Sequence, residues 1–407
     1  MNKSSEKPAF FLQDKVLPFL VLCISLSVSL TVWVMLDRSF KQKASVVFTD
    51  TADDITYQVV TRLQDHKQIL LGGLGLFNAS DEVTREDWRN YVSSLKLERN
   101  LPGILGLGYA KWLTSGELEE NVHAIRADGF SEYRVTPEGV RPVYVPVIYI
   151  EPFSWRNQRA LGYDIYTESV RRSALDKARD GGIATIATKI TLVQETDKGK
   201  QSGVLMFVPV YRKGAQTDSL EQRQRAIQGF VYSPIRMNDF IYGTLKRLPQ
   251  DLAFEIYSDE SQKAETLMFS SIQAEKTDIP EGFTPAFTRR TAVEAYGKTW
   301  CFSYRSLPAF SQRLEKGKSY AVLIICVLSS IILSVICFVI LRTRNKALVM
   351  AEGLKESQEF YRSIFNETLA PKLLIDPTSG HIVEANPAAC EYYGYSREGL
   401  IKRHTAV

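Results

Sequence analysis

Two long uncharged runs dominate the pattern of apolar and polar positions along the chain. The run Leu17–Leu36 contains 20 residues, and Tyr320–Leu341 contains 22. About 20 apolar residues span the hydrocarbon core of a bilayer, so both runs predict transmembrane helices. The first run could instead be a signal peptide, but it is long for one and no small-residue cleavage site follows it. We therefore predict an uncleaved anchor.

Residues 37–77, directly after the first run, show a helical period and predict a long stalk helix. The glycines of Gly72–Ser80 predict the end of this helix. An apolar stripe serves either a helix packed within its own chain or a stalk that pairs with a second copy, and both readings stay open. The stripe comprises Phe48, Ala52, Ile55, Val59, Leu63, Ile69 and Leu70.

A second helix is predicted after Thr84, which suits a helix N-cap, with Asp87 three residues on. A third is predicted at about 166–179, with Gly181 and Gly182 placed to stop it. One apolar face marks each helix: Trp88, Tyr91, Val92 and Leu95 on the second, and Val170, Ala174 and Ala178 on the third.

Strand-like runs fill most of the remaining region between the two spans and predict an antiparallel α+β domain. Residues 133–135 and 143–150 read as a hairpin-like pair, in which Pro146 argues for an edge or a bulge. The polar segment 196–201 is the expected turn between strands at 183–192 and 203–211. Further strands are expected at 104–112, 229–232, 253–257, 267–270 and 299–304, and a helix at 237–248.

Composition excludes several classes of function. Charged residues make up 24% of the chain and the net charge is +4, too balanced to argue for a nucleic-acid partner. The five cysteines and four histidines have no disulfide-framework or metal-site spacing, so we expect neither a metal nor a cofactor. No catalytic motif is recognisable, and we assign no catalytic residue. Basic residues flank both spans almost evenly and only slightly favour termini inside the cell.

The segment after the second span resembles a PAS domain. The matching residues are Leu374-Ile375-Asp376, Gly380-His381-Ile382-Val383, Ala385-Asn386, and Gly394-Tyr395-Ser396 with Leu400. They cover only the first half of such a domain, so we expect the chain to be a fragment of a longer protein.

The region between the spans resembles the CHASE domain, an extracytoplasmic sensor of plant cytokinin receptors and bacterial signalling proteins. The resemblance implies a long stalk helix and two PAS-like antiparallel-sheet subdomains, with the ligand in the membrane-distal one. It rests on Pro102-Gly103-Ile104, Gly106-Leu107-Gly108-Tyr109, Pro137-Glu138-Gly139, Glu151-Pro152, Ala160-Leu161-Gly162-Tyr163-Asp164, Arg171-Arg172, Val193-Gln194-Glu195 and Pro209-Val210-Tyr211.

The resemblance also implies ligand-binding residues. In plant relatives an aspartate before the charged helix and a backbone amide in the next strand bind an adenine ring, and by position these are Asp164 and Ile186. A capping or turn role would explain Asp164 equally simply. For Arg156, Arg171 and Arg172 we expect solvated faces and ion pairs rather than ligand contacts.

Together these features predict a multi-pass receptor of the cell inner membrane, with a periplasmic sensor and both termini cytoplasmic. The expected order is a cytoplasmic N-terminus (1–16), a first transmembrane helix (17–36), a sensor region (37–319), a second transmembrane helix (320–341), a linker helix (342–358) and half a PAS domain (359–407). Within the sensor we expect the stalk at 37–77, the CHASE core at about 85–245 and a membrane-proximal part at 246–319.

The expected partners are a small-molecule ligand, either adenine-type or an unknown metabolite, and a second copy of the chain paired through stalk and transmembrane helices. Because the implied output domain lies outside these residues, a histidine kinase, a diguanylate cyclase or phosphodiesterase, and a ligand-independent scaffold receptor all stay open.

Overall fold

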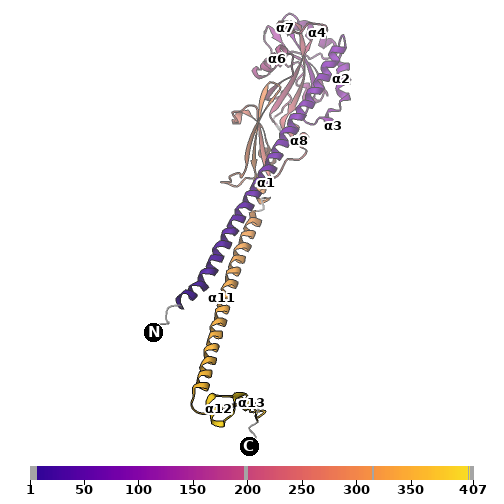
Figure 1. Cartoon of the computed structure of the whole chain (residues 1–407). Helices are drawn as coiled ribbons and strands as arrows, with labels where there is room; N and C mark the ends of the chain where they lie inside the picture. Colours follow the sequence, from indigo (N-terminus) through magenta and orange to yellow (C-terminus); the bar gives the residue numbers. More distant parts are fainter. Residues whose placement is uncertain (1–6, 197–199, 314–315, 402, 404–407) are drawn as a thin grey trace. The chain divides into compact units, whose positions relative to one another are not determined.

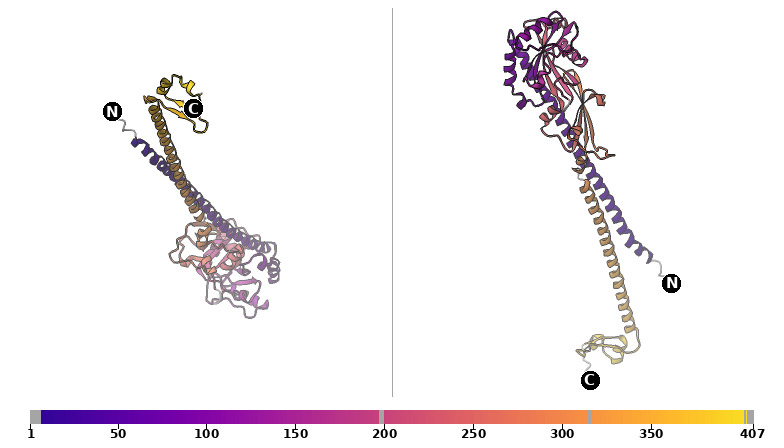
Figure 2. Two further views of the ribbon diagram at one scale, coloured as in Figure 1. Left: turned by 90° about the horizontal axis from the view of Figure 1, so that it is seen from below. Right: turned by 180° about the vertical axis from the view of Figure 1, so that it is seen from behind.

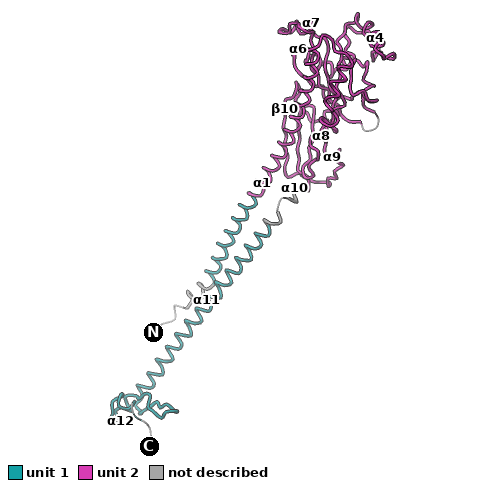
Figure 3. The backbone as a smooth tube through the Cα atoms, turned by 90° about the vertical axis from the view of Figure 1, so that its right-hand side faces the viewer, with its two compact units in different colours: residues 1–37, 316–407 teal, residues 38–315 magenta. Residues whose placement is uncertain are grey.

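The computed structural model describes residues 7–196, 200–313, 316–401 and 403. The chain forms two compact units, residues 38–315 and residues 1–37 with 316–407 (Figure 3). The turn predicted at 196–201 falls largely on 197–199, outside the described residues.

Two long helices build most of the smaller unit. Helix α1 (Lys7–Ala79) begins there, and α11 (Lys316–Glu367) lies beside it. The two helices touch at Ser29 and Ser330, whose hydroxyls are 3.3 Å apart. Both helices are long and apolar enough to cross a membrane, and only 6% of each apolar window is buried. Their outward side chains are large and apolar, as a lipid-facing helix requires.

The rest of α1 is the backbone of the larger unit and runs along two β-sheets (Figures 1 and 2). The predicted stripe is almost wholly buried, from Phe48 at 2% exposed to Leu70 at 0%, and only Ile69 stays half-buried. It packs against side chains of both sheets in one continuous core. The stripe therefore serves as a helix packed within its own chain, and any pairing of stalks would use another face of α1.

The helix does not end at the glycines, contrary to the prediction from the sequence. It continues through Gly72 and Gly73 to Ala79. A methyl group on Gly72 would stand 2.5 Å from the Tyr91 hydroxyl, and one on Gly73 would stand 3.1 Å from the Trp88 ring. These glycines allow α2 to approach α1 closely, and this packing outweighs the poor helix propensity of glycine.

Helix α2 (Arg85–Ser94) begins as predicted. The Thr84 hydroxyl accepts a hydrogen bond from the Asp87 amide, and the Asp87 carboxylate accepts one from the Thr84 amide. The helix buries Trp88 and Val92, and a short helix α3 (Leu97–Asn100) follows it.

The first sheet has five antiparallel strands in the order β4-β1-β7-β6-β5. Strand β4 lies at an edge and starts after Pro146, as the proline predicted. Residues 133–135 form no strand; β4 pairs with β1 instead, and the next residue, Thr136, forms an isolated bridge to Tyr163. The strands are β1 (Leu107–Lys111), β4 (Val147–Glu151), β5 (Thr185–Ile190), β6 (Gly203–Tyr211) and β7 (Ile227–Arg236).

Short elements surround this sheet and connect its strands. Helix α6 (Ser169–Gly181) packs on β5 and β6 and ends at Gly182, whose φ of 62° is the left-handed cap that the sequence predicted. The others are β2 (Leu113–Thr114), α4 (Leu118–Ala127), β3 (Val143–Tyr144), α5 (Trp155–Gln158) and α7 (Leu220–Ala226).

The second sheet has four antiparallel strands in the order β10-β11-β8-β9. Its hairpin turns at Tyr296-Gly297, both with positive φ, as two-residue turns between twisted strands favour. The elements of this part are α8 (Met237–Leu245), β8 (Leu252–Tyr257), η1 (Ala264–Thr266), β9 (Leu267–Ser270), α9 (Ser271–Glu275), β10 (Thr288–Ala295), β11 (Lys298–Ser306) and α10 (Pro308–Arg313).

The C-terminal segment pairs β12 (Leu373–Ile375) with β13 (Ile382–Ala385) and adds α12 (Pro387–Tyr393) and α13 (Arg397–Ile401). Buried Asn386 organises it. Its side chain caps α12 by accepting from the Ala389 amide, and its amide group donates to the carbonyls of Thr368 and Ala370.

A glycine of α1 that allows close packing can be distinguished experimentally from one that has no close neighbour. Gly72→Ala should lower the free energy of unfolding by about 1 kcal/mol, because the methyl group displaces the Tyr91 hydroxyl from its bond to the Ile69 carbonyl. Gly75→Ala is the matched control: nothing lies within 4 Å of its added methyl group, so it should raise stability by up to about 1 kcal/mol. Thermal unfolding of the purified chain measures both, and equal effects would contradict the close-packing argument.

His66 occupies the buried stripe of α1 at 0% exposure, and its ring packs edge-on against Phe240. Burial lowers the pKa of His66 from 6.5 to about 4, an effect that the bond to the Arg62 carbonyl partly offsets. Because the unfolded chain binds this proton more tightly, stability should fall by about 1.4 kcal/mol per pH unit as the pH drops from 6.5 toward 4.

The matched comparison is His66→Leu, which removes this titration. The difference in unfolding free energy between the two proteins should change across that pH window and stay constant above it. A difference that is independent of pH would contradict the buried, neutral state of His66.

Candidate ligand-binding site

The segment between β4 and α6 crosses one face of the first sheet and holds several buried polar side chains. Gly106 in the turn before β1 permits this close cover, because a methyl group there would stand 2.5 Å from the Glu151 carbonyl oxygen and 2.8 Å from the Asn157 amide. The Asn157 amide donates to the carbonyls of Leu105 and Pro152. Gly106 therefore shows the close approach of other backbone that the sequence indicated, whereas Gly108 makes room for the side chain of Tyr232.

Asp164 is fully buried at 0% exposure. Its Oδ1 accepts hydrogen bonds from the amides of Val145 and Tyr166, and its Oδ2 lies 3.2 Å from Arg141 Nε. Asp164 does not cap α6, since Glu168 occupies the N-cap position. Of the capping and turn roles considered for Asp164, the geometry matches the turn role.

Ile186 lies in β5, at the other end of the sheet from the bridge between Asp164 and Pro146 beside β4. Its amide donates to the Tyr296 carbonyl at 3.1 Å and so joins the two sheets. The structure therefore gives each predicted residue a partner of its own, and no hydrogen bond between Asp164 and Ile186 is present among the described residues. Their shared role in binding a ligand stays a prediction.

Arg171 is 4% exposed, which differs from the solvated face expected for it. Its Nη2 donates to the Thr191 carbonyl at 2.7 Å, and its guanidinium stacks over the Tyr163 ring at 5.1 Å. Its Nε lies 3.5 Å from Glu168 Oε2 but forms no hydrogen bond with any described residue. Arg172, by contrast, is exposed as expected, and Arg156 stacks on Trp155.

Tyr232 in β7 lies at 1% exposure on the same face of the sheet, where its ring covers Gly108. Burial raises the pKa of Tyr232, and the charge of Arg171 acts in the opposite direction. Its hydroxyl has no hydrogen-bond partner among the described residues. An unsatisfied buried hydroxyl costs about 1–3 kcal/mol, so this group is unusual in a folded interior.

Tyr163, Asp164, Arg171 and Tyr232 together form what we call the polar cluster. The Tyr163 ring contacts Arg171 and is adjacent in sequence to Asp164. The cluster presents a carboxylate oxygen, a guanidinium N–H and a phenol, none of which has a hydrogen bond within the described part of the chain. The first two do have ion-pair partners, Arg141 for Asp164 and Glu168 for Arg171. Groups of these three kinds are suited to a ligand that offers both donors and acceptors.

Sequence reasoning missed Arg171 and Tyr232. The buried residues of α6 are Arg171, Ala174, Leu175 and Ala178, an i, i+3, i+4, i+7 set. The apolar members of that set could have indicated the burial of Arg171. No comparable signal marked the Tyr232 hydroxyl, because an aromatic residue in a buried strand is ordinary.

Comparisons with known proteins agree with this architecture. Residues 81–269 match the model of the CHASE domain, and residues 359–406 match that of a PAS domain. The chain thus contains a CHASE domain followed by PAS-domain sequence, and the resemblance recognised from the sequence is confirmed. It is a mixed helix and sheet protein in which two candidate membrane helices flank the CHASE region.

Two curated relatives indicate the setting of these domains. Hybrid signal transduction histidine kinase A of Dictyostelium discoideum is 22% identical over 309 residues, which cover 71% of this chain and 14% of the relative. Diguanylate cyclase DgcM of Escherichia coli (strain K12) is 44% identical over 61 residues, 15% of each chain. The matched region is therefore a small part of each relative.

The structural role of Asp164 can be tested without a ligand. Asp164→Ala should lower the free energy of unfolding by about 3 kcal/mol, since it leaves two amides and Arg141 without their partner. Asp164→Asn keeps the Oδ1 acceptor and should lose clearly less. Unfolding of both variants measures the difference, and equal stability of the wild type and Asp164→Ala would contradict this structural role.

Proposed function

We propose that the chain is the sensing part of a membrane-bound receptor. Its CHASE domain binds a small molecule outside the cytoplasm, and α1 and α11 connect that domain across the inner membrane to cytoplasmic termini. The PAS segment passes the signal to an output domain. The observation on which this proposal depends most is the polar cluster, a buried group of polar atoms without hydrogen bonds to described residues, inside the CHASE domain.

The chemistry of the cluster favours a flat, polar ligand such as an adenine-type compound. One edge of adenine offers an amino donor, which suits the Asp164 carboxylate, and ring nitrogens that accept, which suit Arg171 and Tyr232. Binding changes signalling only if the ligand prefers one of two states of the receptor. The segment 152–168 that covers the cluster, and α6 after it, are the parts that would differ between those states.

A histidine kinase is the output that we favour. The kinase relative matches 71% of this chain, whereas the cyclase relative matches 15%. A diguanylate cyclase is the second candidate, because the identity to the cyclase is higher, at 44%. A gene sequence that encoded an output domain after residue 407 would distinguish the two.

Tyr232→Phe tests the binding site directly. Without ligand this variant should be as stable as the wild type or up to about 1 kcal/mol more stable, because it removes an unsatisfied buried hydroxyl. It should also weaken ligand binding by about three- to tenfold, the loss of one hydrogen bond. Thermal unfolding of the full chain with adenine, N6-substituted adenines and small metabolites measures both effects.

Tyr109→Phe is the matched control, because Tyr109 is also buried but donates to the Gln228 carbonyl at 3.1 Å. It should lose about 1 kcal/mol of stability and keep ligand binding. A ligand at 100 times its dissociation constant adds about 2.7 kcal/mol to the wild type. If no compound stabilises the protein while the intact receptor still signals, the scaffold function is favoured instead.

A further inference from the structure

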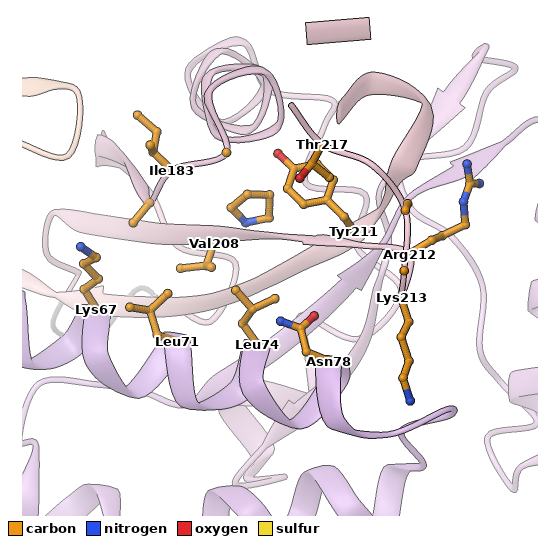
Figure 4. A pocket seen from close by; sticks show the side chains of 15 residues that line it. Lys67, Leu71, Leu74, Asn78, Ile183, Val208, Tyr211, Arg212, Lys213 and Thr217 are labelled. Atoms are coloured by element: carbon orange, nitrogen blue, oxygen red, sulfur yellow. The ribbon is translucent and has the colours of Figure 1, made fainter. Parts of the chain in front are cut away.

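A cavity lies on the opposite face of the first sheet from the polar cluster. It has a volume of about 510 Å³ and lies between α1 and β6 (Figure 4). Val208, which lines it, belongs to the core on the α1 side, whereas Phe207 and Tyr232 belong to the core on the other side. We call it the stalk cavity, and a volume of this size is typical of small-molecule sites.

The walls of the stalk cavity are apolar at its middle. Leu71 and Leu74 of α1 face Val208 of β6, and Ile183 stands at the mouth with 54% of its surface exposed. Such walls favour a ligand with a flat or chain-like apolar body, because burying apolar surface drives its binding.

Cations line the cavity without any acidic residue among its fifteen described lining residues. Arg212 donates to the Arg225 carbonyl, and Lys213 forms an exposed ion pair with Asp81. Lys67 differs from both: it has no ion pair with a described carboxylate and only a distant contact with the Tyr296 ring, at 5.9 Å. Glu294 lines a separate cavity that Lys67 also borders.

We propose that the stalk cavity binds a small amphiphilic carboxylate, with its apolar body between α1 and β6 and its carboxylate at Lys67. A cation beside an apolar slot recognises an anion with an apolar body, and excludes cationic ligands by repulsion. This site is independent of the polar cluster. Because one of its walls is α1, a ligand there contacts the helix that continues toward the membrane segment.

The probe for this proposal is 2-naphthoate, and its uncharged analogue is 2-naphthamide. Calorimetric titration uses the full chain in lipid nanodiscs. The wild type should bind naphthoate saturably, with one site per chain, and more tightly than naphthamide. Lys67→Gln should weaken naphthoate about tenfold and leave naphthamide unchanged, because it removes a charge-assisted hydrogen bond. Lys263→Gln, an exposed lysine beside η1, is the matched control and should change neither affinity.

Two further variants test the position of the site. Leu74→Trp fills the cavity and should abolish binding of both probes. Ile183→Glu places a negative charge on an exposed residue at the mouth, so it should weaken naphthoate binding. Because residue 183 is exposed, this variant also serves as a test if Leu74→Trp does not fold. Absence of saturable naphthoate binding, or equal affinity for naphthoate in the wild type and Lys67→Gln, would overturn the proposal. So would naphthoate binding that Tyr232→Phe weakens and Lys67→Gln does not, since the probe would then occupy the polar cluster.

Discussion

The buried stripe of α1 is the constraint on which the larger unit depends. Side chains from Phe48 to Leu70 pack against both sheets in one core, so the helix links the two sheets. Successive turns of α1 therefore contact strands that are far apart in sequence. His66 lies within this stripe, and burial lowers its pKa because the charged imidazolium is disfavoured there.

The two faces of the first sheet have different uses because strand side chains alternate. On one face, α6 and the preceding segment enclose polar groups that the fold leaves partly unsatisfied. On the other face, α1 leaves an apolar cavity with cations at its ends. A stable fold tolerates the first arrangement only at a cost in free energy, and such costs concentrate at functional sites. The two proposed sites thus lie on opposite faces of one sheet.

Local signals in the sequence were reliable where local interactions decide the structure. The capping pair at Thr84 and Asp87 and the stop at Gly182 need only neighbouring residues, and both are present. The glycines of α1 misled because their partners, Tyr91 and Trp88, lie in another helix. The predicted pairing of 133–135 with 143–150 is absent because β4 pairs with β1, a strand from an earlier part of the chain.

The sequence by itself determined the membrane-length helices, the antiparallel α+β class, the CHASE and PAS resemblance and the burial of most of the stripe. Each of these follows from composition, periodicity or ordered motifs along the chain. Only the tertiary structure decided that Arg171 reaches the Thr191 carbonyl, that the Tyr232 hydroxyl has no described partner, and that a cavity lies between α1 and part of β6. These features arise from side chains that meet across long sequence separations, and hydrophobic periodicity contains no information about such meetings.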